Sequence, residues 1–205
     1  MPVTKNTRML LIATRNPGKL RELRILLAGT PYECISLDDA GINEEVPETG
    51  QSFEENAIIK ATEYARLSGL LTLADDSGLE VDALDGEPGI RSARYAGNDA
   101  SDADRIDLLI RKLSKIPDNK LTARFRCVIA VVSPGSDPEI YEGTCEGRIV
   151  RSPRGNGGFG YDPVFLSVEL GKTMAELSPD EKNRYSHRSI ASQKVCEYLN
   201  MRMAE

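Results

Sequence analysis

Histidine is nearly absent, because the chain of 205 residues contains only His187. A mechanism that needs two histidine ligands or a cluster of histidines is therefore excluded. Four cysteines are present, but they lie far apart and form no C-x-x-C motif, which argues against a zinc site or a disulfide framework. The chemistry must come from carboxylates, Lys, Arg and backbone amides, together with any metal that is bound through oxygen.

Long apolar runs and an excess of positive charge are also missing. No apolar run approaches the roughly 20 residues that a membrane helix needs, and the short run at 9–14 leads into Arg15, so we expect no signal peptide. The net charge is −6, with 26 Lys and Arg against 32 Asp and Glu, which argues against a protein whose main task is to coat nucleic acid. We expect a cytoplasmic protein with reduced thiols and with neither a membrane nor a nucleic acid as partner.

Apolar and capping patterns predict an α/β fold. Strands are predicted at 9–14, 32–37, 70–74, 125–132, 139–150 and 164–166, and helices begin at Pro17 and after Ser52, Ser101 and Ser178, with a last helix around 191–199. Helices alternate with strands early and strands pair as a hairpin late, which predicts a mixed twisted sheet with flanking helices. The length suits one large domain, 1–205, or two lobes that share a cleft, and we expect residues 1–8 to form a flexible N-terminal extension.

The first candidate site follows the first predicted strand and comprises Thr14, Arg15, Asn16, Pro17, Gly18 and Lys19. A strand, a turn and a helix start bring backbone N–H groups and a positive dipole together, and Lys19 adds a charge, which is typical of a phosphate site. The segment is not a Walker A loop, because Ala13 and Leu20 stand where that motif needs Gly and Ser or Thr. An ordinary strand–helix turn with Asn16 as the cap is an equally good interpretation.

The second candidate is Asp75-Asp76-Ser77-Gly78, which follows an apolar strand. Adjacent residues of an extended chain point to opposite sides, so one Asp is expected in the site while the other holds the loop. Carboxylates at a strand end suit Mg²⁺, and the acidic loop at 44–48 offers a further ligand. A polar turn is the alternative for Asp75-Asp76-Ser77-Gly78, and a solvated run of charge is the alternative for the loop.

The third candidate, Gly155-Asn-Gly-Gly-Phe-Gly160, matches the dinucleotide-binding pattern by letter, but an extended segment follows it instead of a helix. The glycines around Phe159 indicate backbone close to a flat ligand, with a flexible hairpin loop as the alternative. The fourth candidate combines Lys182, Ser186, His187 and Arg188, whose donors suit a ligand edge that presents acceptors such as a keto oxygen; a solvated helix start is the alternative.

The fifth candidate is Lys60, four residues after Asn56 on one side of the second helix. Its side chain is placed to reach a phosphate or to pair with an acidic metal ligand, and a surface lysine is the alternative. Glu55 is explained as the partner of Ser52 in a capping box.

Together these segments resemble the inosine/xanthosine triphosphate pyrophosphatase family, enzymes that remove non-standard purine nucleotides. The matching stretches are ATRNPGKLREL, ETGQSFEENAIIKA, ADDSGLEVDALDGEPGIRSARYAG, RFRCVIAVV, GGFGYDPVF and KNRYSHR. They follow one another in the family's order from residue 10 to about residue 190, so the resemblance covers nearly the whole chain.

The resemblance implies two lobes around a central nucleotide-binding cleft, a homodimer, and Mg²⁺-dependent hydrolysis of ITP, dITP and XTP to the monophosphate and pyrophosphate. It implies that Asp76 is the general base and a metal ligand, that Ser77 contacts the substrate, and that Lys60 and the turn Thr14–Lys19 bind the phosphates. It further implies that Phe159, Gly160, Tyr161 and Asp162 form the base-stacking loop, and that Lys182, His187 and Arg188 face the purine edge. Pro47 departs from a glutamate found in some members, which leaves Glu48 as the nearest second carboxylate for a metal.

Two other classes of function remain open from the sequence. A non-catalytic nucleotide-binding regulatory module would keep the phosphate turn but would not need Asp76. A kinase or nucleotidyl transferase would use the same Mg²⁺–phosphate geometry with a second substrate and would show little hydrolysis.

Overall fold

The computed structural model describes residues 8–202, and its six strands form one sheet in the order β2-β1-β3-β4-β5-β6. The strands are β1 (Arg8–Ile12), β2 (Tyr32–Ser36), β3 (Leu71–Val81), β4 (Thr122–Val132), β5 (Glu139–Ile149) and β6 (Phe165–Ser167). Strand β1 pairs in parallel with β2 and β3, whereas β5 and β6 are antiparallel. The predicted α/β fold with a mixed sheet and flanking helices is therefore confirmed. Residues 1–7 of the expected N-terminal extension lie outside the described residues, and Arg8 begins β1.

The described chain divides into two compact units. The first contains the residues up to Asp76, Val128–Tyr141 and the chain from Ala191 onward; the second contains Ser77–Cys127 and Glu142–Ile190. Strands β3, β4 and β5 each contribute residues to both units.

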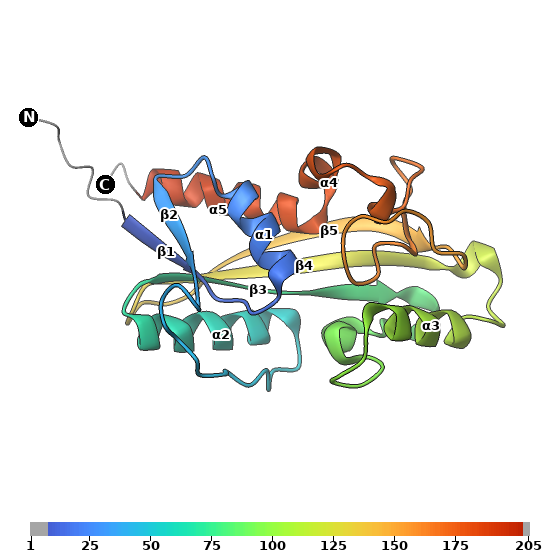
Figure 1. The fold of residues 1–205 in the computed structure, drawn as a ribbon, viewed down its shortest axis with the longest axis horizontal. Coiled ribbons are helices and arrows are strands. Elements are labelled where there is room, and N and C mark those ends of the chain that lie inside the picture. Colours follow the sequence, from blue (N-terminus) through green and yellow to red (C-terminus); the bar gives the residue numbers. More distant parts are fainter. Residues whose placement is uncertain (1–7, 203–205) are drawn as a thin grey trace, which may run out of the picture. The chain divides into compact units, whose positions relative to one another are not determined.

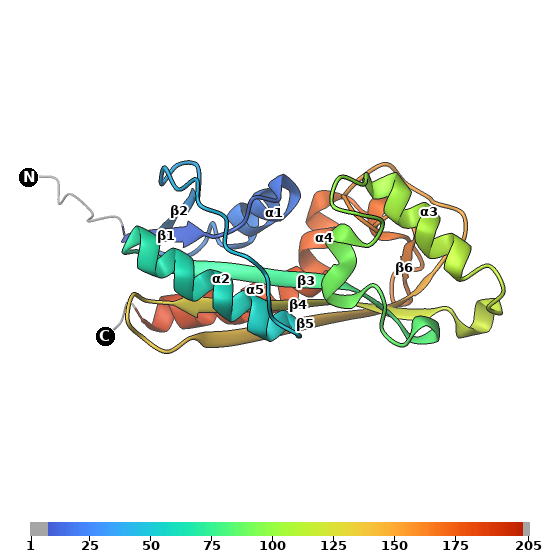
Figure 2. The ribbon, with the colours of Figure 1, turned by 90° about the horizontal axis from the view of Figure 1, so that it is seen from below.

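In the first unit, helices cover both faces of the parallel strands. The helices are α1 (Pro17–Leu26), α2 (Phe53–Ser68) and most of α5 (His187–Met201). Figure 1 shows α2 along one face of the strands with α1 and α5 on the opposite face, and Figure 2 shows α2 from below, in front of the strands. Leu10, Leu11 and Ile12 of β1 are accordingly 0% exposed, as expected for a strand that is buried on both faces.

Capping side chains determine where α1 and α2 begin. Asn16 caps α1 by accepting from the Lys19 backbone N–H at 3.0 Å, and Pro17 occupies the first turn. Ser52 caps α2 by accepting from the Glu55 N–H at 3.1 Å. The Glu55 carboxylate accepts from the Gln51 N–H at 2.6 Å, one residue before the position that the expected capping box would use.

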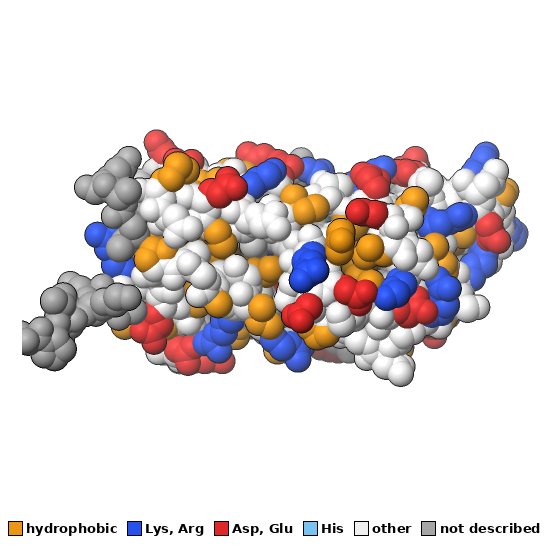
Figure 3. Space-filling view, turned by 90° about the horizontal axis from the view of Figure 1, so that it is seen from above, with side chains coloured by type: hydrophobic (Ala, Val, Ile, Leu, Met, Phe, Trp, Pro, Cys, Tyr) orange, Lys and Arg blue, Asp and Glu red, His pale blue; other side chains and the backbone are white. Residues whose placement is uncertain are grey.

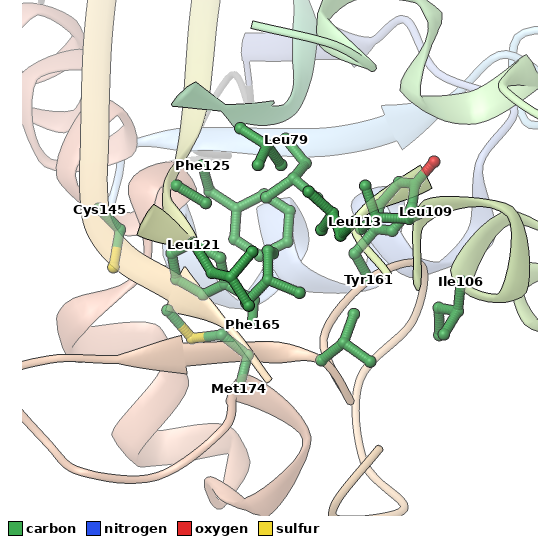
Figure 4. Packing of buried hydrophobic residues seen from close by; sticks show 14 of the residues in the cluster. Leu79, Ile106, Leu109, Leu113, Leu121, Phe125, Cys145, Tyr161, Phe165 and Met174 are labelled. Atoms are coloured by element: carbon green, nitrogen blue, oxygen red, sulfur yellow. The ribbon is translucent and has the colours of Figure 1, made fainter. Parts of the chain in front are cut away.

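The second unit is built around one hydrophobic cluster, which Figure 4 shows from close by. Helix α3 (Asp102–Lys112) contributes Ile106 and Leu109 to it, and Phe125 of β4 lies 4.4 Å from Phe165 of β6 between ring centroids. Figure 1 shows α3 and α4 (Pro179–Tyr185) on opposite sides of the strands. A short 3₁₀ helix spans Gly89–Arg94.

Strand β3 is longer than the sequence predicts. The expected strand ends at Ala74 before a polar segment, but β3 continues through Asp75, Asp76, Ser77 and Gly78 to Val81. The two carboxylates are buried and paired with lysines, as described below, so the strand does not have to end where the polar residues begin. The carboxylates lie inside a strand rather than in a turn after it.

The surface carries charges of both signs. On the face drawn in Figure 3, Lys and Arg side chains lie beside Asp and Glu side chains. Within residues 8–202, no helix combines the length and the apolar character that crossing a membrane would require.

Candidate active site

Carboxylates and lysines meet in the first unit and form what we call the carboxylate–lysine cluster: Lys60, Asp75 and Asp76, which are buried, and Lys19 and Glu48, which are half-buried. Lys19 Nζ lies 3.2 Å from Asp75 Oδ2. Lys60 Nζ lies 2.7 Å from Glu48 Oε1 and 3.6 Å from Asp76 Oδ1, and it donates to the Asp75 backbone carbonyl at 2.8 Å. Two ammonium groups against three carboxylates leave the ionised cluster with an excess of negative charge.

The alternation of side chains along β3 separates the two aspartates. Asp75 pairs with Lys19 of α1, and Asp76 pairs with Lys60 of α2, on the opposite face of the strands. Asp75 is 0% exposed and Asp76 is 6% exposed. The two carboxylates thus have separate partners, as the expected alternation requires.

A residue without a role assigned from the sequence completes the surroundings of Asp76. Asn56 of α2 is 0% exposed, and its Nδ2 donates to Asp76 Oδ2 at 3.1 Å. Lys60 lies one helical turn further on, so the two side chains of α2 approach different oxygens of Asp76. The spacing of Asn56 and Lys60 beside the apolar face is the signal from which this contact could have been found.

Burial and charge oppose each other at Asp76 and Lys60. Burial raises the pKa of the Asp76 carboxyl above its ordinary value, although Lys60 and Lys19 act in the other direction. Burial also lowers the pKa of Lys60, but the carboxylates of Asp76, Glu48 and Asp75 outweigh it, and the pKa of Lys60 is raised. Asp76 is therefore a stronger base than an ordinary aspartate and lies beside an ammonium group whose own pKa is raised.

The segment Thr14–Lys19 connects β1 to the first turn of α1, as expected. Its side chains make different kinds of contact. The Asn16 backbone N–H donates to Thr14 Oγ1 at 3.2 Å, and the Asn16 side chain caps α1, so Thr14 and Asn16 both shape the turn. Arg15 Nη2 donates to the carbonyls of Ile42 and Glu44 at 3.1 and 3.0 Å, which attaches the turn to the acidic loop. Lys19 is the cation of this turn that belongs to the carboxylate–lysine cluster.

The second unit holds what we call the aromatic–basic cluster: Phe159, Asp162, Lys182, His187 and Arg188. Lys182 Nζ lies 4.7 Å and Arg188 Cζ 5.7 Å from the centroid of the Phe159 ring. Asp162 Oδ2 accepts from the Phe159 N–H at 2.9 Å and from Lys182 Nζ. One buried carboxylate thus holds both the loop backbone and the lysine beside the aromatic ring.

His187 and Arg188 are buried at the start of α5. The His187 ring stacks on Phe125, with centroids 4.8 Å apart and planes 16° apart. Arg188 is 1% exposed, and its Nη2 donates to Ser77 Oγ at 2.8 Å. Ser77 is therefore placed with the residues expected at the purine edge.

Two residues of the expected base-stacking loop have other contacts. Tyr161 is 4% exposed in the hydrophobic cluster of the second unit, and its hydroxyl donates to the Ser92 carbonyl at 3.1 Å. Gly160 contributes its backbone N–H, which donates to Asp102 Oδ2 at 2.6 Å. Phe159 is the half-buried aromatic residue of this loop, and the side chain of Tyr161 serves the core.

The oxygen ligands of the first unit suit a hard cation. Among residues 8–202, no group of three or more His, Cys, Asp or Glu side chains is arranged to hold a metal by itself. Asp76 and Glu48 nevertheless both approach Lys60, and the cluster has excess negative charge. Mg²⁺ is commonly bound through one or two carboxylates, with water and substrate phosphates as the other ligands, so these residues fit such an ion.

Comparison with known proteins gives a family. A family model described as the Ham1 family matches residues 10–198, almost the whole chain. The chain belongs to the Ham1 family. The family resemblance inferred from the sequence motifs is confirmed by this match and by the named relatives.

Curated relatives of the Ham1 chain match it over nearly their full lengths. The dITP/XTP pyrophosphatase of Geobacillus kaustophilus is 51% identical over 188 residues, which cover 92% of each chain. The dITP/XTP pyrophosphatase of Geobacter sulfurreducens is 50% identical over 190 residues, covering 93% of this chain and 96% of that protein.

Solved Ham1 structures share the fold. A HAM1 protein from Coxiella burnetii is 42% identical with a TM-score of 0.86, covering 94% of this chain and 98% of that one. The Ham1 protein of Staphylococcus aureus is 39% identical with a TM-score of 0.85, covering 95% of this chain and 100% of that one.

Proposed function

We propose that this Ham1 family chain is a nucleoside-triphosphate pyrophosphatase that hydrolyses the non-standard purine nucleotides ITP, dITP and XTP to the monophosphate and pyrophosphate, and so removes them from the nucleotide pool. The observation that carries the proposal is Asp76, a buried carboxylate of raised pKa that lies between Lys60 and Asn56. The dITP/XTP pyrophosphatases of Geobacillus kaustophilus and Geobacter sulfurreducens are about half identical to this chain, which supports the same activity. No observation favours the non-catalytic alternative.

The carboxylate–lysine cluster supplies the hydrolytic chemistry in this proposal. Asp76 orients a water molecule and accepts its proton while the water oxygen forms a bond to the α-phosphorus. The bond from the α-phosphorus to the bridging oxygen breaks, and pyrophosphate leaves with the electron pair. Lys19, Lys60 and the backbone N–H groups at the start of α1 stabilise the negative charge that grows on the leaving oxygens.

We propose that the reaction depends on Mg²⁺, which Asp76 and Glu48 would hold. The ion would neutralise charge on the phosphate oxygens when it is bound. Lys60 lies between these two carboxylates, at 2.7 Å from Glu48 and 3.6 Å from Asp76, and so limits their mutual repulsion. The excess negative charge of the cluster also disfavours a triphosphate that arrives without a cation.

The aromatic–basic cluster selects the base. Phe159 offers a face for stacking, with Lys182 and Arg188 beside its ring. Hypoxanthine and xanthine present an acceptor oxygen at position 6, whereas adenine presents an amino donor there. Donors from Lys182, His187 or Arg188 pair with the oxygen, and a purine with an amino group at position 6 leaves them unpaired in a buried site.

We further propose a homodimer, as the family resemblance implies, and a cytoplasmic location, which the scattered cysteines favour. Sedimentation at micromolar protein concentration tests the assembly, with the mass of two chains as the expected result. A single species with the mass of one chain would refute the dimer without affecting the proposed activity.

The deciding experiment is pyrophosphate release from ITP, XTP, GTP and ATP, each with Mg²⁺ and with EDTA. Fast release from ITP and XTP with Mg²⁺, with the monophosphate as co-product, is the expected result. Orthophosphate as the product would place the attack at the γ-phosphorus. No release from any of the four nucleotides would leave the regulatory module as the better hypothesis.

A further inference from the structure

The side chain of Asn56 is fixed at both ends. Its Oδ1 accepts from the Gly50 backbone N–H at 2.8 Å, and its Nδ2 donates to Asp76 Oδ2 at 3.1 Å. The residue is 0% exposed, so the amide has given up its hydration for these two hydrogen bonds. Asn56 therefore links the end of the acidic loop to the carboxylate inside β3.

Chemistry allows only one orientation of this amide. A backbone N–H can only donate, so the oxygen of Asn56 must face Gly50 and its NH₂ group must face Asp76. A flipped amide would bring two donors together at Gly50 and two acceptors together at Asp76. The contact with Gly50 thus dictates that Asp76 receives a hydrogen-bond donor.

Gly50 maintains this contact because no side chain fits at its position. A Cβ atom there would lie 2.6 Å from Glu55 Cβ and 2.8 Å from Asn56 Oδ1. Only glycine allows the loop backbone to approach α2 so closely. The loop, the amide and Asp76 therefore form one connected unit.

Asn56 and Lys60 contact different oxygens of Asp76. Asn56 donates from a neutral amide to Oδ2, and Lys60 places an ammonium group 3.6 Å from Oδ1. We infer that Asn56 is a positioning residue for the hydrolysis: it holds the Asp76 carboxylate in one orientation, with Oδ1 turned toward Lys60. The inference rests on the proposed function, in which that carboxylate orients the attacking water.

The variant Asn56→Asp distinguishes two roles of Asn56: orienting the Asp76 carboxylate, and attaching the loop at Gly50 to α2. The new carboxylate keeps an acceptor for the Gly50 N–H but presents a second acceptor oxygen to Asp76 in place of the donor. We expect kcat for ITP to fall roughly 10- to 100-fold, the range typical when hydrogen-bond partners of metal-binding side chains are removed. Because Asn56→Asp adds a carboxylate to a cluster that is already negative, the dissociation constant of ITP in EDTA is measured by calorimetry on the neutral variant Asn56→Ala, where it should change less than threefold. A purely structural role predicts a kcat close to that of the unmodified chain, and that result would overturn the inference.

Asn56→Ala gives a second test that adds no buried charge. It should lower kcat in the same range while ITP still binds, measured at a temperature where circular dichroism shows the variant to be folded. Thr72→Val is the matched control: Thr72 is also 0% exposed, and its hydroxyl donates to the Leu70 carbonyl at 3.0 Å, away from Asp76. An equal loss of kcat in Thr72→Val would attribute the effect to packing and overturn the inference.

Asp76→Asn, measured beside these variants, separates the two hypotheses. An inactive Asp76→Asn with an active Asn56→Asp would refute the positioning role alone. Full activity in Asp76→Asn would refute the proposed role of Asp76 and, with it, the role of Asn56.

Discussion

Arg188 and Ser77 are joined by a 2.8 Å hydrogen bond from the guanidinium Nη2 to the hydroxyl oxygen, although 111 positions separate them in the chain. Ser77 directly follows Asp76 in the sequence. The placement of Arg188 is therefore tied to the strand that carries the proposed catalytic carboxylate. A buried guanidinium with a fixed hydroxyl acceptor is also a rigid donor for a ligand.

We predict that Arg188→Ala loses the preference for ITP over ATP. If the guanidinium is the donor that pairs with the oxygen at position 6 in the proposed reaction, its removal should reduce the ratio of kcat/KM for ITP and ATP by at least about tenfold. Arg184→Ala removes the same charge from an exposed position of α4 and is the control. An unchanged ratio in Arg188→Ala would refute its role at the purine edge.

The Phe159 loop should tolerate no side chain at Gly158. This glycine has φ +72°, and a Cβ atom would lie 1.9 Å from Asp162 Oδ2. Gly158→Ala should therefore displace Asp162 from the Phe159 N–H and from Lys182, and raise KM for ITP about 10- to 100-fold.

Gly171→Ala is the matched control for this prediction. Gly171 has φ +64°, but a Cβ atom there meets nothing within 4 Å. Both variants should lose about 1–2 kcal/mol of unfolding free energy to the left-handed backbone, measured by urea denaturation. Equal KM values in the two variants would show that backbone strain alone matters.

Lys60→Met should lower the stability of the fold as well as the rate of the proposed hydrolysis. The substitution leaves Glu48 and Asp76 close together without their shared ammonium group. We expect a loss of about 3–5 kcal/mol in the free energy of unfolding at pH 7, typical of a broken buried ion pair. Lys115→Met, at an exposed position, should change it by less than about 0.5 kcal/mol. Urea denaturation measures both, and equal stabilities would contradict the burial of this ion pair.

The contacts of Glu181 at the start of α4 predict that the free energy of unfolding falls at low pH. Glu181 accepts from the Ser178 N–H at 2.8 Å and from Lys172 at 3.0 Å, and these interactions lower its pKa from 4.5 to about 2. A carboxyl with a lowered folded-state pKa stabilises the fold above its unfolded pKa, and this contribution is lost as the pH falls from 4.5 through about 2. The stability difference between the unmodified chain and Glu181→Gln should therefore shrink as the pH is lowered below 4.5 in chemical denaturation. Asp180→Asn removes the same charge from the same turn without removing the capping partner, and an identical profile in that variant would refute the assignment.

Local signals were sufficient to predict much of the fold. Asn16 and Ser52 cap the helices that follow them, and Gly69 ends α2 with a φ of +69°, because such interactions lie within a few positions of the chain. The opposite directions of Asp75 and Asp76 also follow from the period of an extended strand. The length of β3 could not be predicted, because it depends on lysines of α1 and α2 that pair with its carboxylates.

Contacts over long distances in the chain decided the rest of the site. Arg15 donates to the carbonyls of Ile42 and Glu44, and Tyr161 packs in the hydrophobic cluster of the second unit. Both residues nevertheless belong to motifs that resemble ligand-binding segments. Asn56 was visible only as a neighbour of Lys60 on the helix, because its link to Asp76 spans 20 positions. Which polar residue of a motif meets a ligand and which supports the fold depends on such tertiary partners.

The spacing of Asn56 and Lys60 also determines where the chain tolerates insertions and deletions. Adding or removing one residue between them would rotate the later side chain about 100° around α2. Lys60 would then lose its ion pairs with both Asp76 and Glu48, because the same ammonium group makes both contacts. Changes of length in this region should therefore accumulate in the exposed part of the acidic loop before Glu48, and variants that shift the register of α2 should be lost from any library selected for activity.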